Sequence, residues 1–262
     1  MKKQRHNINF YLGLVLVLLV GLMVCVGIFY TPFDPNAMDG TAMSQSPSLK
    51  HWFGTDYFGR DIFSRVMKGA GTTFFVAICT VLIGGSIGTI VGAVTGYYGG
   101  IVDEIVMRIN DGVASFPSIL LALIFVSIFD YGKYPVILAL GIIFIPSFAR
   151  VVRGEFLKMK SMDYVRNAKL LGASDLRIMF IHMLPNAKSI MISTIGIAFN
   201  NAVLAESGMS YLGLGVQPPD ASLGRMLSEA QTYLMSAPWL ALAPGIIIMI
   251  TVLGFYLVSE NL

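Results

Sequence analysis

The sequence predicts an all-α, polytopic membrane protein that crosses the bilayer six times. Apolar residues make up 55% of its 262 residues and charged residues only 13%, whereas a soluble domain averages about 25% charged residues. The apolar residues are gathered in six segments, and a basic block at residues 150–188 separates the fourth from the fifth. The net charge of +3 is small, and because the basic residues stand beside apolar segments it does not indicate nucleic acid as a partner.

The first apolar segment runs from Phe10 to Tyr30 without a charge. At 1.5 Å per residue, a helix of this length spans a hydrocarbon core of about 30 Å. Lys2, Lys3 and Arg5 precede it, and no small-residue cleavage site is obvious before Thr31. We therefore expect a retained helix with its N-terminus inside rather than a signal peptide.

A polar, turn-rich stretch at residues 31–71 follows and is expected outside the membrane. Its most specific part lies between His51 and Arg65, where acidic and basic residues can pair and two glycines permit tight turns. We expect this part to be a structured interfacial segment packed on the helix ends, with direct contact to a solute as the alternative. Its residues of interest are Gly54, Thr55, Asp56, Gly59, Arg60 and Asp61, with Arg65 as a further pairing partner.

The second span is expected from Thr72 to Tyr98. It carries small residues at every fourth position, which draws a stripe along one helix face. In lipid such a stripe lets two helix backbones approach closely, so we expect a tight helix–helix contact there. The stripe consists of Gly84, Gly88, Gly92 and Gly96.

The third span is expected at residues 112–129, and the fourth is expected to be rather short. Residues 97–111 are interpreted as an inside turn, and Gly112 to Phe129 returns outward with Pro117 near its start. That proline is expected to kink the helix or to lie in its first turn. After a short outside loop that begins at Asp130, the fourth span is expected from Val136 to Ala149.

The block from Arg150 to Lys188 holds eight of the eighteen Lys and Arg residues of the chain. Lys and Arg are retained on the cytoplasmic side, so this block is predicted to be a cytoplasmic loop. Tyr164 to Leu171 has helix formers and no breaker, and Gly172 interrupts it. Ser174 or Asp175 can cap a second short helix, which is expected to end at Leu184-Pro185. Leu157, Tyr164, Ala168 and Leu171 are spaced for one helical face, which we expect to dock into a partner.

The fifth span is expected from Ser189 to Leu204, with Asn200 and Asn201 near its end and Glu206 just beyond. A carboxylate at membrane depth normally faces the bundle interior or water. Two interpretations stay open for Glu206. It accepts backbone hydrogen bonds or pairs with an outer arginine such as Arg60 or Arg225, or it lines a translocation path together with the two asparagines and meets the positive end of a solute.

The sixth span is expected from Pro238 to Val258, after an outside loop that reaches Ser236. Inside segments then hold twelve Lys and Arg residues and outside segments six, which places both chain ends inside. The chain shows no phosphate-cradling glycine loop, no nucleophile motif and no His or Cys cluster with metal-ligand spacing. We therefore expect a pore-forming protein rather than an enzyme, with no cofactor or metal of its own.

Several strings resemble the permease subunits of ABC importers, in particular those of the oligopeptide, dipeptide and nickel group. The outer segment resembles the "GTD…GRD…SR" signature of that group, and residues 210–215 resemble its "SFLGLG" string. The basic block resembles the "EAA" loop, although Arg166-Asn167-Ala168 stands where the family has Glu-Ala-Ala. The loop residues that carry the resemblance are Tyr164, Val165, Ala168, Gly172, Ala173, Ser174 and the run from His182 to Asn186.

The resemblance implies the fold of a type I ABC importer permease, with residues 1–71 as an N-terminal helix and outer segment and residues 72–262 as the permease domain. In that family the loop at residues 150–188 carries a coupling helix that fits a groove on a cytoplasmic ATPase. The contact residues would be Tyr164, Ala168, Leu171, Gly172, Ala173, Ser174, Leu184 and Pro185.

The implied partners are a homologous second permease subunit, forming a heterodimer, and two ATP-binding subunits that bind ATP and magnesium. An extracytoplasmic solute-binding protein completes the complex, in the cytoplasmic membrane of a prokaryote. Short peptides are the expected solutes, and nickel or a metal chelate is the alternative. An ion-coupled secondary transporter, which needs several ionisable groups within its spans, ranks lower because only Glu206 is near one.

Relatives usually continue past the sixth span with a short polar tail, at the place where this sequence has Ser259-Glu260-Asn261-Leu262. Because the last span is complete before that point, we expect the six-span fold not to need the tail.

Overall fold

The structure is a computed structural model, and it describes residues 8–129 and 131–260. The N-terminal basic residues Lys2, Lys3 and Arg5, the start of the second outside loop at Asp130, and the terminal Asn261-Leu262 lie outside the described residues.

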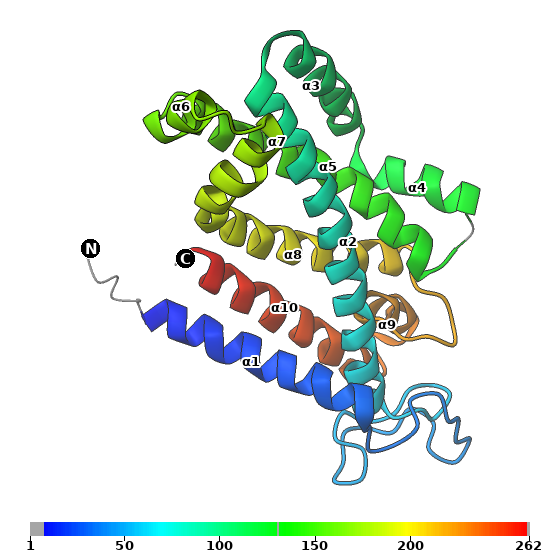
Figure 1. The fold of residues 1–262 in the computed structure, drawn as a ribbon. Coiled ribbons are helices and arrows are strands. Elements are labelled where there is room, and N and C mark those ends of the chain that lie inside the picture. Colours follow the sequence, from blue (N-terminus) through cyan, green and yellow to red (C-terminus); the bar gives the residue numbers. More distant parts are fainter. Residues whose placement is uncertain (1–7, 130, 261–262) are drawn as a thin grey trace.

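The described chain is helical, and its β-structure there is limited to one isolated bridge between Thr55 and Asp61. Five helices are long and apolar enough to cross a membrane, and the crossings number six when the bent pair of helices Gly100–Ser115 and Ser118–Phe129 is counted as one span. Figure 1 shows the order along the chain: α1 Ile8–Phe29, α2 Ile62–Tyr98, α3 Gly100–Ser115, α4 Ser118–Phe129, α5 Lys133–Lys160, α6 Asp163–Leu170, α7 Asp175–Arg177, α8 Lys188–Tyr211, α9 Leu223–Ala230 and α10 Trp239–Glu260.

Helix α2 is the longest element and connects the two ends of the molecule (Figure 1). Its 37 residues correspond to about 55 Å of helix. The helix begins at Ile62, ten residues before the span expected from Thr72, because Asp61 caps it by accepting a hydrogen bond from the Ser64 amide at 2.8 Å. Residues 62–71, expected to be polar and turn-rich, are therefore helical. The boundary expected between residues 71 and 72 therefore falls inside α2.

The expectation of an inside turn at residues 97–111 is also wrong. Helix α3 occupies this stretch, and its acidic residues pair with arginines at the inner end of α5. Arg153 contacts Asp103 with both Nε and Nη2, at 2.5 and 2.6 Å, and Arg150 Nη2 lies 3.0 Å from Asp111. These pairs hold α3 as a helix beside α5, which sequence spacing alone did not indicate.

Pro117 separates α3 from α4, which meet at an angle of 88°. Proline disfavours the helical conformation of the residue before it, and Phe116 is accordingly extended at φ −77° and ψ 134°. The Pro117 carbonyl then accepts hydrogen bonds from the amides of Leu120 and Leu121, which starts α4. The proline thus breaks the third crossing into two helices, a larger effect than a kink within one helix.

The glycine stripe of α2 lies against α5 along its whole length. A Cβ atom added at Gly84 would come within 2.8 Å of the Phe144 Cβ, and one added at Gly88 within 2.6 Å of the Phe148 Cβ. Gly92 and Gly96 meet the next turns of α5 at similarly short separations. The two backbones are therefore too close for any side chain at these positions.

The loop between α7 and α8 continues as helix instead of ending at the proline. Residues Ile178–Met183 form a π-helical turn and residues Leu184–Ala187 a 3₁₀ turn, which leads directly into α8. The expected helix end at Leu184-Pro185 is therefore wrong. The change of helical pitch accommodates Pro185, which has no amide hydrogen to donate and lies in the first turn of the 3₁₀ segment.

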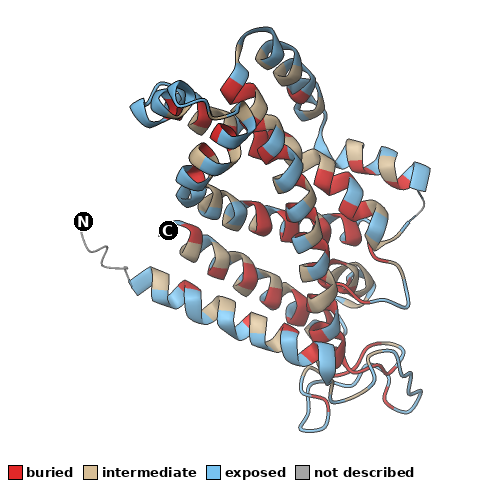
Figure 2. Cartoon of the chain, in the orientation of Figure 1, coloured by how far each residue is buried: buried red, intermediate tan, exposed pale blue. Residues whose placement is uncertain are grey.

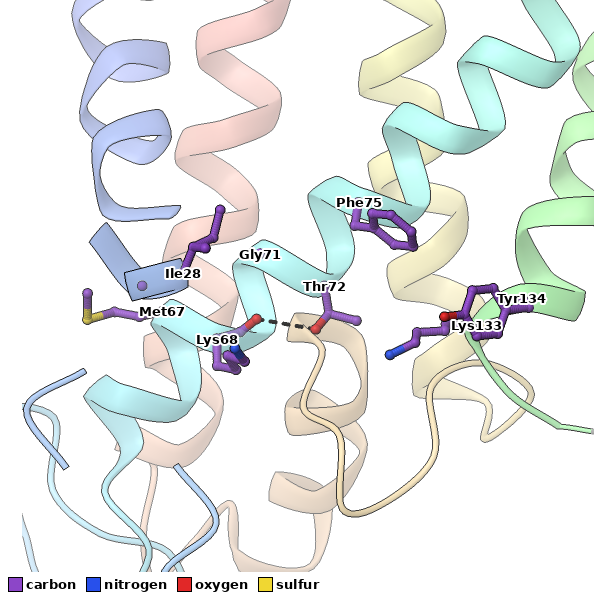
Figure 3. A pocket seen from close by; sticks show the side chains of 9 residues that line it. Ile28, Met67, Lys68, Gly71, Thr72, Phe75, Lys133 and Tyr134 are labelled. Carbon is purple, nitrogen blue, oxygen red and sulfur yellow. Dashed lines mark hydrogen bonds between the residues drawn. The ribbon is translucent and has the colours of Figure 1, made fainter. Parts of the chain in front are cut away.

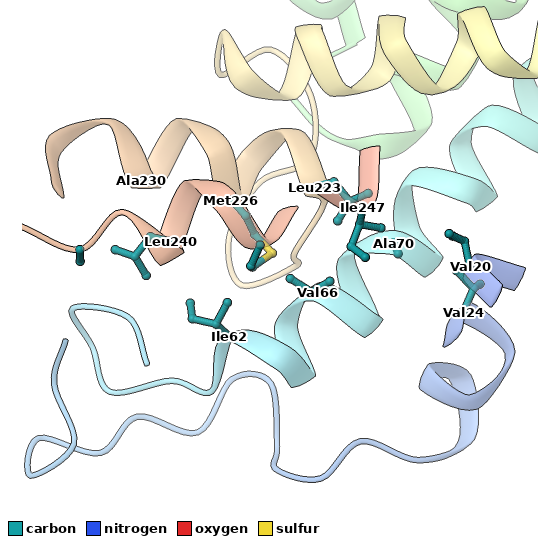
Figure 4. Close-up of a cluster of buried hydrophobic side chains, with 12 residues drawn as sticks. Val20, Val24, Ile62, Val66, Ala70, Leu223, Met226, Ala230, Leu240 and Ile247 are labelled. Atoms are coloured by element: carbon teal, nitrogen blue, oxygen red, sulfur yellow. The ribbon is translucent and has the colours of Figure 1, made fainter. Parts of the chain in front are cut away.

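Buried side chains are concentrated where α2 meets its neighbours, whereas α1 exposes most of its surface (Figure 2). Figure 4 shows a cluster formed by α1, α2, α9 and the start of α10, in which Val66 and Leu223 are fully buried. The apolar residues exposed on α1, such as Leu18 and Leu22, are at positions that lipid contacts in a membrane.

Candidate functional site

The outer segment is a compact, buried structure at the start of α2. All six residues selected from the sequence are buried, and Gly54 and Gly59 both adopt φ of +77°, which favours glycine. Asp56 Oδ1 accepts hydrogen bonds from the amides of Phe58 and Arg60, both at 2.9 Å. The Thr55 hydroxyl accepts from the Gln45 amide at 2.8 Å and donates to the Ala42 carbonyl. This burial supports a structural role for the segment.

The expected pairing within the segment is confirmed for Asp56 and Arg60, whose Oδ2 and Nε atoms are 2.6 Å apart. Asp61 serves differently, since it caps α2 and also lies 2.8 Å from the ring nitrogen of His51. Arg65 is only 1% exposed, and its Nη1 donates to the Pro35 carbonyl at 3.1 Å.

Glu229 of α9 joins this group, although no local feature of the sequence indicates it. Its Oε2 atom lies 3.3 Å from Arg60 Nη2 and 3.5 Å from Arg65 Nη2, while Oε1 accepts from Arg225 Nε at 3.2 Å. Tyr57 stacks on Tyr233 beside the group, and burial raises the pKa of the Tyr57 phenol. We call Asp56, Arg60, Arg65, Arg225 and Glu229 the outer ion cluster; it joins the outer segment to the loop that follows α8.

The basic loop at residues 150–188 lies at the opposite end of α2 (Figure 1). Val165 of α6 is buried in a cluster with Val152, Phe156 and Met179, so α6 packs on the inner end of α5 and on the π-helical turn. Tyr97, near the end of α2, donates a hydrogen bond to Asp175 at 2.6 Å. This contact, which the sequence did not indicate, ties the loop to α2.

The selected loop residues divide into a packed set and an exposed set. Ala168, Ala173 and Leu184 are half-buried against the cluster, whereas Tyr164, Gly172, Ser174 and Pro185 are exposed. Leu171 is 88% exposed, and its neighbour Leu170 is 85% exposed. Leu157 belongs to α5, which ends at Lys160, so the expected single face that joins it to α6 is not continuous.

Gly172 makes the turn after α6. Its φ is +80°, and a Cβ atom built there would meet no atom within 4 Å. Ser174 then caps α7 by accepting a hydrogen bond from the Arg177 amide. Gly172 is therefore selected by backbone conformation within this chain rather than by lack of space.

Glu206 is fully buried in α8 and has hydroxyl groups on several sides. Ser210, one turn later, donates to its Oε1 atom at 2.6 Å, whereas its Oε2 atom is buried without a hydrogen-bond partner among the described residues. The hydroxyl groups of Thr73 and Ser222 lie near the carboxyl group. Thr73 comes from α2 and Ser222 caps α9. The carboxyl group thus lies where α2, α8 and the start of α9 meet.

The expected ion pair of Glu206 with an outer arginine is not formed in the described chain, because Arg60 and Arg225 both pair with Glu229. The two asparagines differ in exposure. Asn200 is half-buried with a buried carboxamide oxygen, and Asn201 is exposed. The structure therefore does not bring Glu206, Asn200 and Asn201 together as one exposed set.

The comparisons with known proteins agree with this architecture. The family profile of the binding-protein-dependent transport system inner membrane component matches residues 88–262. The glutathione transport system permease protein GsiD of Pectobacterium atrosepticum is 38% identical over 259 residues, covering 98% of this chain and 86% of the relative. The dipeptide transport system permease protein DppC of Haemophilus influenzae is 35% identical over 264 residues, covering 98% and 90%.

A solved structure of the MetNI methionine ABC transporter, in inward-facing conformations, has a TM-score of 0.59 and covers 76% of this chain and 96% of its own. At 19% identity it supports the fold alone.

Together, the helical crossings, the fold and the relatives define a multi-pass transport protein of the type I ABC importer permease class. The chain belongs to the family of binding-protein-dependent transport system inner membrane components. It is a permease subunit rather than an enzyme, and membership of this family implies that it works with an ATPase and a binding protein.

Proposed function

We propose that this chain is one of two homologous permease subunits in an ATP-driven importer of short peptides. Two ATP-binding subunits supply the energy by binding ATP and magnesium, and an extracytoplasmic binding protein delivers the solute. The relatives named for glutathione and dipeptide transport, each aligned over 98% of this chain, support a peptide rather than nickel or a metal chelate. Both chain ends and the loop at residues 150–188 lie on the cytoplasmic side.

The proposed contact with the ATPase rests on one observation, the exposed apolar edge of the basic loop. Leu170, Leu171 and Leu176 are 85%, 88% and 65% exposed, and they lie among Arg166, Lys169 and Arg177. Charged neighbours keep this edge out of the hydrocarbon core. Exposed leucines outside the membrane favour a protein partner, and the position expected for the coupling helix makes that partner the ATPase.

The first experiment tests the ATPase contact. The chain is co-expressed with its partner subunits, purified in detergent through a tag on this chain, and examined for bound ATP-binding subunit. We expect Leu171→Asp to lose the ATPase while the two permease subunits stay together, because a carboxylate replaces the exposed apolar contact. Leu49→Asp is the control, since Leu49 is 99% exposed in the outer loop. Full ATPase recovery with Leu171→Asp, or equal loss with both variants, contradicts the assignment.

The second experiment tests the solute. The complex in proteoliposomes, with its binding protein, is supplied with a labelled dipeptide, labelled glutathione or nickel. We expect uptake of a peptide that requires ATP and persists when ion gradients are collapsed. Uptake of nickel without uptake of peptide would show that the solute is a metal rather than a peptide. Uptake driven by an ion gradient without ATP would contradict the importer mechanism.

A further inference from the structure

A pocket of about 330 Å³ opens at the outer ends of α1 and α2 and the start of α5. This volume is within the range of small-ligand sites, about 300–1,000 Å³. Two cationic side chains reach it, and in Figure 3 Lys68 and Lys133 lie on either side of Thr72. The functional sites described above do not include these residues, so the pocket is a separate feature.

One face of α2 forms the wall of the pocket. Lys68, Gly71, Thr72 and Phe75 are spaced three, four and seven residues from the first, which places them on the same side of the helix. Phe75 lies about 10 Å deeper along α2 than Lys68. A Cβ atom built at Gly71 would meet no atom within 4 Å, so the wall is hollow between the cation and the aromatic ring.

The pocket lies beside the last turn of α1 and the first turn of α5. Ile28 is next to the last residue of α1, and Lys133 and Tyr134 are the first two residues of α5. Lys and Tyr are the residue types found at the boundary between hydrocarbon and headgroups, where their apolar stems contact the chains and their polar ends face the headgroups. The apolar part of the lining consists of Ile28, Met67 and Phe75, of which Phe75 lies farthest along α2 from the outer end.

The charge of the pocket complements one negative charge. Lys133 Nζ lies 2.8 Å from Asp220, so these two groups neutralise each other. Lys68 is exposed and forms no ion pair within the part of the chain that the structure describes. The remaining net charge of Lys68, Lys133 and Asp220 is therefore +1, which matches a phosphodiester without a compensating amine.

We propose that this pocket binds an anionic phospholipid of the phosphatidylglycerol type. Its phosphodiester lies between the two lysines, and one acyl chain follows the hollow at Gly71 toward Phe75. A zwitterionic lipid carries its own cation and gains less from Lys68. A free phosphate ion would use the lysines but has no group for the apolar wall.

Native mass spectrometry of the purified importer complex, titrated with phosphatidylglycerol or phosphatidylcholine, tests the proposal. We expect the wild-type complex to retain phosphatidylglycerol preferentially. Lys68→Gln should weaken this binding about fivefold, the effect of one lysine facing anionic lipid. Gly71→Leu should abolish it by filling the hollow, and Asp220→Asn should strengthen it by freeing Lys133.

Two control variants match these changes. Lys50→Gln removes an exposed outer lysine away from the pocket, and Gly21→Leu adds a leucine on α1 where a Cβ meets no atom within 4 Å. Both should bind lipid as the wild type does, and size-exclusion profiles verify that every variant is folded. Equal retention of the two lipids, wild-type binding by Lys68→Gln and Gly71→Leu, or displacement of the lipid by millimolar inorganic phosphate would overturn the proposal. If the isolated chain binds the lipid but the assembled complex does not, a partner subunit covers this face. That outcome also overturns the proposal.

Discussion

Glu229 Oε2 on α9 lies 3.3 Å from Nη2 of Arg60, a residue 169 positions earlier in the chain. The same oxygen is 3.5 Å from Nη2 of Arg65 in the first turn of α2. One carboxylate therefore links the outer segment, the start of α2 and the helix that follows the fifth crossing. The outer signature that the sequence displays is held in place by a residue outside it.

The first prediction concerns this link. Glu229→Gln removes the charge that faces the buried guanidinium of Arg65, and removal of one partner from a buried ion pair costs about 3–5 kcal/mol. Because Asp56 still pairs with Arg60, we expect a value near the lower limit, measured as a fall of several degrees in the Tm of the purified protein. Glu155→Gln, which breaks a pair with the exposed Lys158, should cost at most about 1 kcal/mol. Equal Tm shifts for the two variants would contradict the structural role of Glu229.

The second prediction concerns the contact of α2 with α5. A Cβ at Gly88 would lie 2.6 Å from the Phe148 Cβ and 2.7 Å from the Ile145 carbonyl oxygen, so Gly88→Ala must push the helices apart. We expect a loss of about 1–3 kcal/mol in unfolding free energy. At Gly154 of α5 a Cβ meets no atom within 4 Å, and Gly154→Ala should instead stabilise by up to about 1 kcal/mol. The two alanine variants should therefore shift Tm in opposite directions.

The third prediction concerns the turn after α6. Gly172 has φ of +80° and open space around it, so the strain of a side chain there comes from the backbone. Gly172→Ala should cost about 1–2 kcal/mol of local stability, and Gly172→Asn less, because Asn tolerates the left-handed conformation. If the turn also fits into the ATPase, Gly172→Leu should uncouple ATP hydrolysis from uptake while Gly172→Asn restores the turn but not the coupling.

Hydrogen exchange of α6 amides and coupled uptake assays separate these effects. Coupling restored by Asn to the glycine level would assign Gly172 to the turn alone. Unchanged uptake with Leu would contradict any contact with the ATPase at this position.

The fourth prediction concerns Glu206. Its full burial and the 2.6 Å hydrogen bond from Ser210 favour a structural junction. A buried polar group that loses its hydrogen-bond partner costs about 1–3 kcal/mol, so Glu206→Gln should lower Tm and assembly without changing solute preference. Glu104→Gln, the same substitution at an exposed position of α3, is the control. Normal assembly with selective loss of solutes that carry a free amino terminus would assign Glu206 to the translocation path instead.

The local sequence determined the class of protein and most of its helices. Apolar length placed α1 and α10 within two residues of the expected bounds, because a span is defined by composition alone. Four glycines at every fourth position indicated a close helix contact, and Gly172 with Ser174 indicated the turn and cap in the basic loop. These features depend on neighbours in the chain, which a sequence displays directly.

Tertiary structure decided which segments meet. The glycine stripe does not indicate that α5 is the helix it contacts, and nothing near Glu229 in the sequence indicates that it faces Arg60 and Arg65. Helix α3 was missed because its polar residues resemble a turn until Arg153 and Arg150 of α5 pair with Asp103 and Asp111. Such contacts join residues tens of positions apart, so they form only once the helices that carry them have packed together. The sequence therefore determined that this is a membrane permease with a basic loop at residues 150–188, while packing alone decided what anchors that loop, what surrounds Glu206 and where a pocket of about 330 Å³ opens.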